Sequence, residues 1–214
     1  MLTDKYRPKA WGDIVGQAEV TGMLAPWESQ DTLRGRAYWI SGKSGTGKTT
    51  IARIIASKLS DKWYTAEMDA SELTVGTLRN IRAELLYAPI SCVSRVFIVN
   101  EAHGLSKAPV RVLLQMLEAP LLHPAVTWVF TTTLDGQMEF EDDHIDAAPL
   151  LSRCMVLKLA ERGLCRPMAI RCREIAAKEG LNGQDITVYE RLLKDKRNNM
   201  RAALQAIEAG AMKG

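Results

Sequence analysis

The stretch YWISGKSGTGKTTIARIIA, residues 38–56, decides the fold. It joins a short apolar run, a glycine-rich turn and a segment with apolar residues at helical spacing. Its centre, GKSGTGKT, matches the pattern GxxxxGK[ST] in full. In such a loop the backbone N–H groups bind phosphate, Lys48 reaches the outer phosphates of a nucleotide, and the Thr49 hydroxyl ligates magnesium. The predicted nucleotide-binding residues of the loop are Gly42, Lys43, Ser44, Gly45, Thr46, Gly47, Lys48, Thr49 and Thr50.

Apolar runs and amphipathic segments alternate along the first 160 residues. The runs at 37–40, 64–71, 95–100 and 125–133 predict strands, and the segments at 49–59, 75–88 and 107–119 predict helices. This alternation is typical of a parallel α/β sheet. Trp39, Trp63 and Trp128 lie in or near these strands and are predicted to be core residues, while the polar segment 134–149 is predicted to be a loop.

The pattern changes near residue 160. Three helical patterns follow one another at 166–181, 184–196 and 198–213. We therefore expect an α/β nucleotide-binding domain over residues 1–160 and a small all-helical domain over residues 161–214.

Composition excludes several classes of protein. The chain has 214 residues, of which 47% are hydrophobic and 25% charged, as in ordinary globular proteins. No apolar run is long enough to span a membrane, and the first residues lack the apolar core of a secretory signal. Four cysteines without a CxxC pair argue against a zinc site and fit a reducing, cytoplasmic setting. A net charge of +3 permits nucleic-acid binding without indicating it.

The stretch RVFIVNEAH, residues 95–103, predicts the second half of the nucleotide site. Its strand carries Asn100 and Glu101 to the carboxyl end of the sheet, where ligands bind in parallel α/β proteins. Glu101 is placed to polarise a water molecule against the γ-phosphate. Position 100 usually holds a carboxylate that contacts magnesium. Asn100 keeps a carbonyl oxygen but lacks the charge, so we expect Thr49 and Asn100 at the metal, ATP binding, and slow hydrolysis.

Further short motifs occur in a fixed order. They are DKYRPKAWGDIVGQ (4–17), MDASE (68–72), NEAHGLSKAPVRVLLQMLEAP (100–120), TTT (131–133), LLSRC (150–154) and NNMRAAL (198–204). With the P-loop, this series resembles AAA+ ATPases of the clamp-loader kind: replication factor C small subunits, their phage counterparts and the bacterial gamma/tau subunit. The likeness covers nearly the whole chain, and the order of the motifs is more specific than any one of them.

The resemblance implies roles for individual residues. Thr133 would sense the γ-phosphate. Arg201 would contact the nucleotide from the helical domain, which would act as a lid. Arg153, after the fifth strand, would be an arginine finger inserted into a neighbouring subunit's ATP site, which implies an oligomer of AAA+ subunits. The implied adenine-pocket residues are Tyr6, Arg7, Pro8, Val15, Gly16 and Gln17.

The resemblance also implies partners, namely primer–template DNA and a sliding clamp. The helices after MDASE and NEAH carry basic residues that would face DNA inside the assembly, although a solvated helix face is the usual role of such charges. These residues are Arg79, Arg82, Lys107 and Arg111. His103 is not expected to bind metal, because no second and third ligand stand at useful spacing.

Two departures from the family pattern leave alternatives open. Asn100 is one, and it favours a scaffold subunit that binds ATP without hydrolysing it. The other is length, because family members carry a third, helical collar domain; this chain would be truncated or would assemble through AAA+ contacts alone. Another DNA-remodelling motor, for branch migration or replication restart, is the remaining alternative, against which the SRC and KYRP motifs argue.

Overall fold

A five-stranded parallel sheet forms the centre of the molecule. The structure is a computed structural model that describes residues 1–86, 94–118, 126–133, 139–140, 145–146 and 148–212. The strand order is β2-β3-β4-β1-β7, and each neighbouring pair is parallel. The strands are β1 (Ala37–Ser41), β2 (Thr65–Asp69), β3 (Arg95–Asn100), β4 (Val126–Thr132) and β7 (Met155–Lys158). The predicted α/β class is thereby confirmed.

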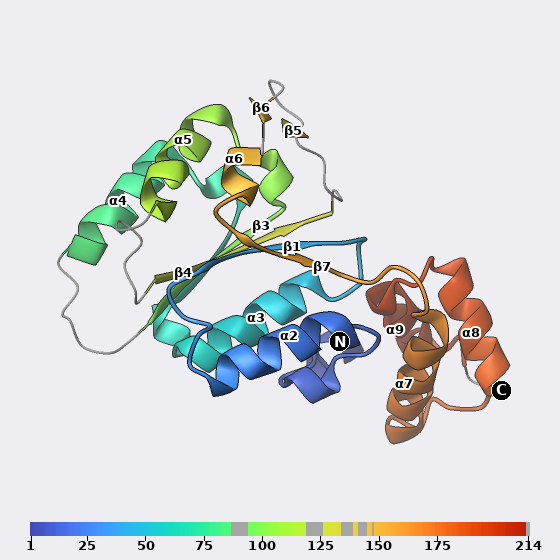
Figure 1. The fold of residues 1–214 in the computed structure, drawn as a ribbon. Coiled ribbons are helices and arrows are strands. Elements are labelled where there is room, and N and C mark those ends of the chain that lie inside the picture. Colours follow the sequence, from blue (N-terminus) through green and yellow to red (C-terminus); the bar gives the residue numbers. More distant parts are fainter. Residues whose placement is uncertain (87–93, 119–125, 134–138, 141–144, 147, 213–214) are drawn as a thin grey trace.

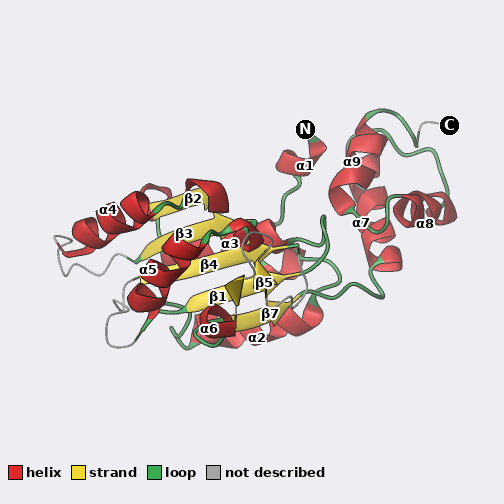
Figure 2. Cartoon of the chain, turned by 90° about the horizontal axis from the view of Figure 1, so that it is seen from above, coloured by secondary structure: helices red, strands yellow, loops and turns green. Residues whose placement is uncertain are grey.

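Helices cover both faces of this sheet, so the α/β part has three layers (Figure 1, Figure 2). The helices α2 (Ala18–Ser29) and α3 (Lys48–Leu59) lie on one face. The helices α4 (Val75–Leu86), α5 (Lys107–Leu117) and the short α6 (Ala148–Leu151) lie on the other. The remaining short elements are α1 (Leu2–Lys5), the 3₁₀ turns Trp11–Asp13, Lys62–Tyr64, Ala70–Glu72 and Ala102–Gly104, and the antiparallel pair β5 (Glu139–Phe140) and β6 (Ile145–Asp146).

Strand side chains alternate between two apolar cores. Phe97, Trp128 and Phe130 point toward α4 and α5, and the rings of Phe97 and Trp128 stack with their centroids 4.7 Å apart. Ile98 and Val129 point the other way, toward α3 and α2. Because the central strands are covered on both faces, their sequences are continuous apolar runs, which explains why the pattern identified them.

Three further helices form a separate unit beside the sheet (Figure 1). They are α7 (Cys165–Lys178), α8 (Ile186–Asp195) and α9 (Met200–Glu208). They share a core of their own, into which Leu2, Tyr6 and Val15 of the N-terminal segment also pack. A division of the chain at residue 160 stays a prediction, and by packing the first residues belong with the helical unit.

Three expectations from the sequence need correction. The edge strand β7 was not predicted, because its apolar run is short and ends at Lys158. Trp63 is not a core residue, since 94% of its surface is exposed. The segment 134–149 contains β5, β6 and the start of α6, and the rest of this predicted loop lies outside the described residues. Among the described helices, none has the length and hydropathy to cross a membrane.

Candidate nucleotide-binding site

The P-loop lies between the carboxyl end of β1 and the first turn of α3. Gly45 has a φ of 81°, a backbone conformation that side chains with a Cβ rarely adopt. A Cβ there would also lie 2.3 Å from Oδ1 of Asn199, the residue before α9. Glycine at position 45 therefore lets the helical unit approach the loop closely.

Lys48 begins α3 and is almost fully buried. Its ammonium donates hydrogen bonds to the carbonyl oxygens of Gly42 at 2.8 Å and Lys43 at 3.0 Å. Burial lowers the pKa of Lys48; the Glu101 carboxylate opposes this shift and the charge of Arg201 adds to it. The cationic groups of the P-loop and of α9 thus lie within electrostatic reach of each other, at the N-terminus of a helix, where anions are stabilised.

A cavity of about 170 Å³ opens above the loop. Three parts of the chain line it: the N-terminal segment with Tyr6, Arg7, Pro8 and Val15, the P-loop from Ser44 to Thr50, and the helical unit. The helical unit contributes apolar side chains such as Met168 and Leu204 together with Arg201. The cavity therefore joins a cationic, N–H-rich end to an apolar end, which is the pattern that a nucleoside triphosphate requires.

Four predicted nucleotide contacts do not line this cavity. Gln17 is buried and ties the loop in place: its Oε1 accepts from Ala160 N at 2.7 Å, and its Nε2 donates to Thr46 O at 3.4 Å. Gly16 lies against Leu164, where an added Cβ would clash. Gly42 accepts from Lys48 through its carbonyl, and the Lys43 side chain pairs with Glu161 at 2.6 Å. These residues shape the loop rather than face the cavity.

The predicted metal position is built from neutral oxygens. Thr49 Oγ1 lies 3.4 Å from Asn100 Oδ1, which also accepts from Thr131 Oγ1 at 2.9 Å. Within the described part of the chain no group of three acidic, histidine or cysteine side chains could hold a metal ion. Magnesium usually keeps several waters and binds one or two protein groups together with substrate phosphates. The Thr49 and Asn100 oxygens beside a phosphate loop fit that mode of binding.

Glu101 follows Asn100 and reaches the cavity wall. Its φ of 50° is unusual for a residue other than glycine, and such strain is common at functional sites. Its carboxylate accepts a hydrogen bond from Thr133 Oγ1 at 3.4 Å and lies 3.5 Å from the His103 ring. His103 in turn lies 3.1 Å from Thr132 Oγ1. The end of β4 thus supports the side chain that would orient a water molecule.

A sequence profile of the ATPase family associated with various cellular activities (AAA) matches residues 38–156, more than half of the chain. The chain belongs to this AAA family. Curated relatives include the DNA polymerase III subunit gamma of Buchnera aphidicola, 30% identical over 184 residues (74% of this chain and 47% of that protein). The subunit tau of Escherichia coli is 31% identical over 182 residues, or 74% of this chain and 27% of that protein. The chain thus spans about half the length of the first relative and a quarter of the second.

Solved AAA structures support the fold. The Thermotoga maritima RuvB Holliday junction branch migration motor superposes with a TM-score of 0.71 at 23% identity, over 95% of this chain and 64% of that one. A variant of the same protein gives a TM-score of 0.72 at 21% identity, over 95% and 65% of the two chains. At this identity the likeness is one of architecture, and it extends through the helical unit that follows the AAA sheet.

Arg153 lies away from the cavity of its own AAA chain. It stands between α6 and β7 and therefore precedes the last strand of the sheet. The prediction that Arg153 follows the fifth strand of the sheet is wrong. Its guanidinium contacts the Glu118 carboxylate at 2.5 Å and donates to the Pro149 carbonyl at 2.8 Å. A role in nucleotide chemistry would therefore require a neighbouring subunit.

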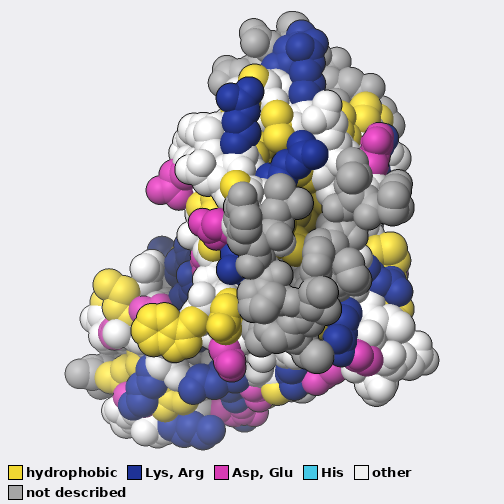
Figure 3. Space-filling view, turned by 90° about the vertical axis from the view of Figure 1, so that its left-hand side faces the viewer, with side chains coloured by type: hydrophobic (Ala, Val, Ile, Leu, Met, Phe, Trp, Pro, Cys, Tyr) yellow, Lys and Arg dark blue, Asp and Glu magenta, His cyan; other side chains and the backbone are white. Residues whose placement is uncertain are grey.

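The four basic residues proposed for DNA lie on α4 and α5 and are exposed. Among the described residues none of the four has an ion-pair partner. Figure 3 shows the face that carries these helices; Lys and Arg side chains lie in its upper part and again in its lower part, where Asp and Glu side chains lie among them. The helices themselves are anchored by apolar residues such as Leu78 and Leu113, so the basic side chains are free to face solvent or a polyanion. The residues concerned are Arg79, Arg82, Lys107 and Arg111.

Sequence reasoning missed several residues of the site. Thr131 contacts Asn100, but the motif had pointed to Thr133. Glu67 on β2 accepts a hydrogen bond from the Asn100 amide at 2.9 Å, a contact that exists only because β2 and β3 are neighbours. The cavity residues Met168 and Leu204 looked like ordinary apolar positions of amphipathic helices. Only the placement of the helical unit over the P-loop separates them from core residues.

Proposed function

We propose that this chain is a clamp-loader-type AAA+ subunit that binds Mg-ATP and couples binding and slow hydrolysis to assembly on DNA during replication. The observation that carries the proposal is the cavity shared by the P-loop, the N-terminal segment and Arg201. ATP bound there would link the two parts of the chain, so ATP and ADP would favour different positions of the helical unit.

Residue roles in this proposal follow from where each group lies. Lys48 and the loop N–H groups hold the phosphates, while Tyr6, Arg7, Pro8 and Val15 border the base. Thr49 and Asn100 hold magnesium, which supplies charge neutralisation of the phosphates when bound. Glu101 orients the attacking water, with Thr133 beside it. The names of the gamma and tau relatives support a role in replication.

The proposed partners follow from the same reading. Arg153 would act on the ATP site of a neighbouring AAA+ subunit. The basic side chains of α4 and α5 would contact primer–template DNA, and a sliding clamp would bind the assembly. The proposed location is the cytoplasm.

The first test is ATP binding measured by isothermal titration calorimetry. Lys48→Ala should weaken ATP binding at least tenfold, about 1.4 kcal/mol or more, because it removes a charged donor to the phosphates. Lys58→Ala is the matched control, since Lys58 lies on the same helix but pairs with Glu28 far from the cavity. Equal ATP affinities in wild type and Lys48→Ala would refute the proposed site.

One second function is favoured by a specific residue. Asn100 lacks the carboxylate that commonly stands at the metal, which supports an ATP-binding scaffold subunit that does not hydrolyse ATP. ATPase measurements with DNA and the sliding clamp separate the two functions. Turnover that Glu101→Gln abolishes would favour the ATPase, and ATP binding without turnover would favour the scaffold.

A further inference from the structure

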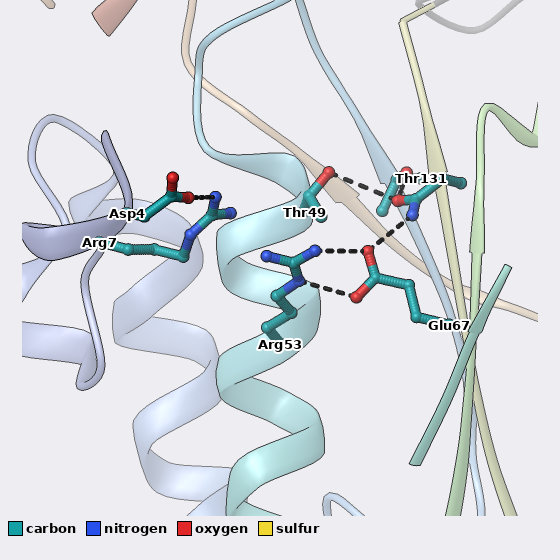
Figure 4. Close-up of polar contacts among 7 residues, drawn as sticks. Asp4, Arg7, Thr49, Arg53, Glu67 and Thr131 are labelled. Atoms are coloured by element: carbon teal, nitrogen blue, oxygen red, sulfur yellow. Dashed lines mark hydrogen bonds and ion pairs between the residues drawn. The ribbon is translucent and has the colours of Figure 1, made fainter. Parts of the chain in front are cut away.

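The Asn100 side chain has two chemically different ends, and its neighbours decide which end faces the P-loop. A carboxylate only accepts hydrogen bonds, so the amide nitrogen must be the atom 2.9 Å from Glu67 Oε1. The carbonyl oxygen then faces the Thr49 and Thr131 hydroxyls, both of which can donate to it. Figure 4 shows this chain of contacts running from α3 through Glu67 to the end of β4.

Glu67 is itself held in a fixed orientation. Arg53 Nε lies 2.7 Å from its Oε2, and Arg53 Nη2 lies 2.9 Å from its Oε1, which is a two-point contact of planar groups. Both carboxylate oxygens of Glu67 are thus engaged as acceptors, Oε2 by Arg53 and Oε1 by Arg53 and Asn100.

We infer that Glu67, held by Arg53, is a positioning residue that keeps the carbonyl oxygen of Asn100, rather than its NH₂ group, directed toward the magnesium position beside Thr49. The inference rests on the proposed Mg-ATP site. An amide turned by 180° would present donor hydrogens to a divalent cation and its waters, whereas the carbonyl oxygen can accept a hydrogen bond from a metal-bound water.

This role depends on the asparagine. An aspartate at position 100 would offer an acceptor whichever way it turned, so Glu67 would matter less for the metal. If the Arg53–Glu67 pair served only to join α3 to β2, its loss would affect folding and nucleotide binding equally, whether or not magnesium is present. The two roles therefore predict different dependence on magnesium and on the residue at position 100.

The test exchanges the two charges in the double variant Arg53→Glu with Glu67→Lys. An ion pair between α3 and β2 is retained, but position 67 now donates a hydrogen bond and draws the Asn100 oxygen away from Thr49. Calorimetric titrations with ATP in EDTA, and of Mg²⁺ into the ATP complex, separate the two roles. We expect ATP affinity in EDTA to stay within about twofold of wild type and Mg²⁺ affinity to fall about tenfold. Adding Asn100→Asp should restore Mg²⁺ affinity.

Other results overturn the inference. Unchanged Mg²⁺ affinity in the exchanged pair, or a loss that Asn100→Asp does not restore, would show that Glu67 does not orient the amide. If the exchanged pair does not fold by circular dichroism, Glu67→Gln decides, because glutamine can both donate and accept; Mg²⁺ affinity should then fall by a smaller factor and recover with Asn100→Asp. If the wild-type protein fails to bind ATP, the proposed function is overturned as well. If the wild-type protein binds ATP, the variants test the role of Glu67 alone.

Discussion

The Arg153 guanidinium lies 2.5 Å from the Glu118 carboxylate, at the point where α5 ends. The pair is partly exposed, and Arg153 also donates to the Pro149 carbonyl. An arginine that is to act on a neighbouring subunit's ATP must exchange this carboxylate for a phosphate. If Arg153 acts as the proposed finger, Glu118 would compete with the nucleotide for it.

Glu118→Gln should release Arg153 and raise the ATPase rate of the assembled protein by up to about fivefold, because an exposed ion pair contributes roughly 0.2–1 kcal/mol. Steady-state ATPase assays measure the change. Glu84→Gln is the control, since Glu84 pairs with Arg95 at 3.0 Å in a comparably exposed position on α4. A fall in rate for Glu118→Gln would instead mean that Glu118 holds Arg153 in its productive orientation.

The pKa of Lys48 predicts a pH dependence of ATP binding. Because burial lowers this pKa below its usual value of 10.5, Lys48 loses its proton earlier than an exposed lysine as the pH rises. Phosphates favour the charged form, so ATP binding should take up protons at alkaline pH, and affinity should decline as the pH rises through the lowered pKa. Titrations in buffers with different ionisation enthalpies measure this uptake. It should vanish in Lys48→Ala, and uptake that persists there must come from another group.

The contact between Asn199 and the P-loop predicts a link between helix capping and nucleotide affinity. Asn199 Oδ1 accepts from Ala202 N at 3.1 Å and so caps α9, the helix that carries Arg201. Asn199→Ala should destabilise the protein by about 1 kcal/mol and should also weaken ATP binding. Asp185→Ala is the matched control, because Asp185 caps α8 by accepting from Thr187 N at 3.0 Å, and α8 contributes no residue to the cavity, whereas α9 does. Equal ATP affinities in the two variants would show that the cap of α9 does not affect the nucleotide site.

Residues that act through local chemistry were predictable from the sequence. The spacing of its glycines identifies the P-loop, and continuous apolar runs identify the strands at Ala37–Ser41 and Arg95–Asn100. β7 was missed because its apolar run is short and ends at Lys158. Glu67 could not be found, because its partner Asn100 lies 33 positions away and is brought to it only by strand order.

Whether a single side chain is buried depends on which elements cover it and could not be predicted from the residue type alone. Trp128 is packed between strands and α5, as its apolar neighbours predict, whereas Trp63 lies in a turn before β2 and is exposed. Both sequences around them contain aromatic and β-forming residues, so the difference depends on which elements cover them. The role of Gln17 could not be predicted from the sequence either. Its motif predicted a contact with the base, but its amide hydrogen-bonds to Ala160 and to Thr46 of the P-loop.

Asn100→Asp tests what a carboxylate at position 100 would do to the stability of the protein and to its response to Mg-ATP. The substitution places a second carboxylate where the Asn100 amide nitrogen lies 2.9 Å from Glu67, while Arg53 is already committed to Glu67 through two hydrogen bonds. Like charges at this distance raise the pKa of one carboxyl group and destabilise the folded protein at neutral pH. Without nucleotide, Asn100→Asp should therefore melt at a lower temperature than wild type, by roughly 2–4 °C for each kcal/mol lost. The deficit should shrink as the pH is lowered, because the folded pair then binds a shared proton.

With Mg-ATP bound, the effect of Asn100→Asp on stability should change sign, because the added negative charge lies beside a divalent cation. Asn100→Asp should gain more thermal stability from Mg-ATP than wild type does, and its ATPase rate in the assembled protein should rise on the order of tenfold, about 1.4 kcal/mol of transition-state stabilisation. Asn100→Ala is the control, since it removes the carbonyl oxygen without adding charge and should gain less thermal stability from Mg-ATP than wild type does. Thermal melts with ATP in EDTA and with Mg-ATP measure both effects in the same samples. If Asn100→Asp melts as wild type does in both conditions, the Glu67 carboxylate does not sense position 100, and the asparagine is neutral in this site.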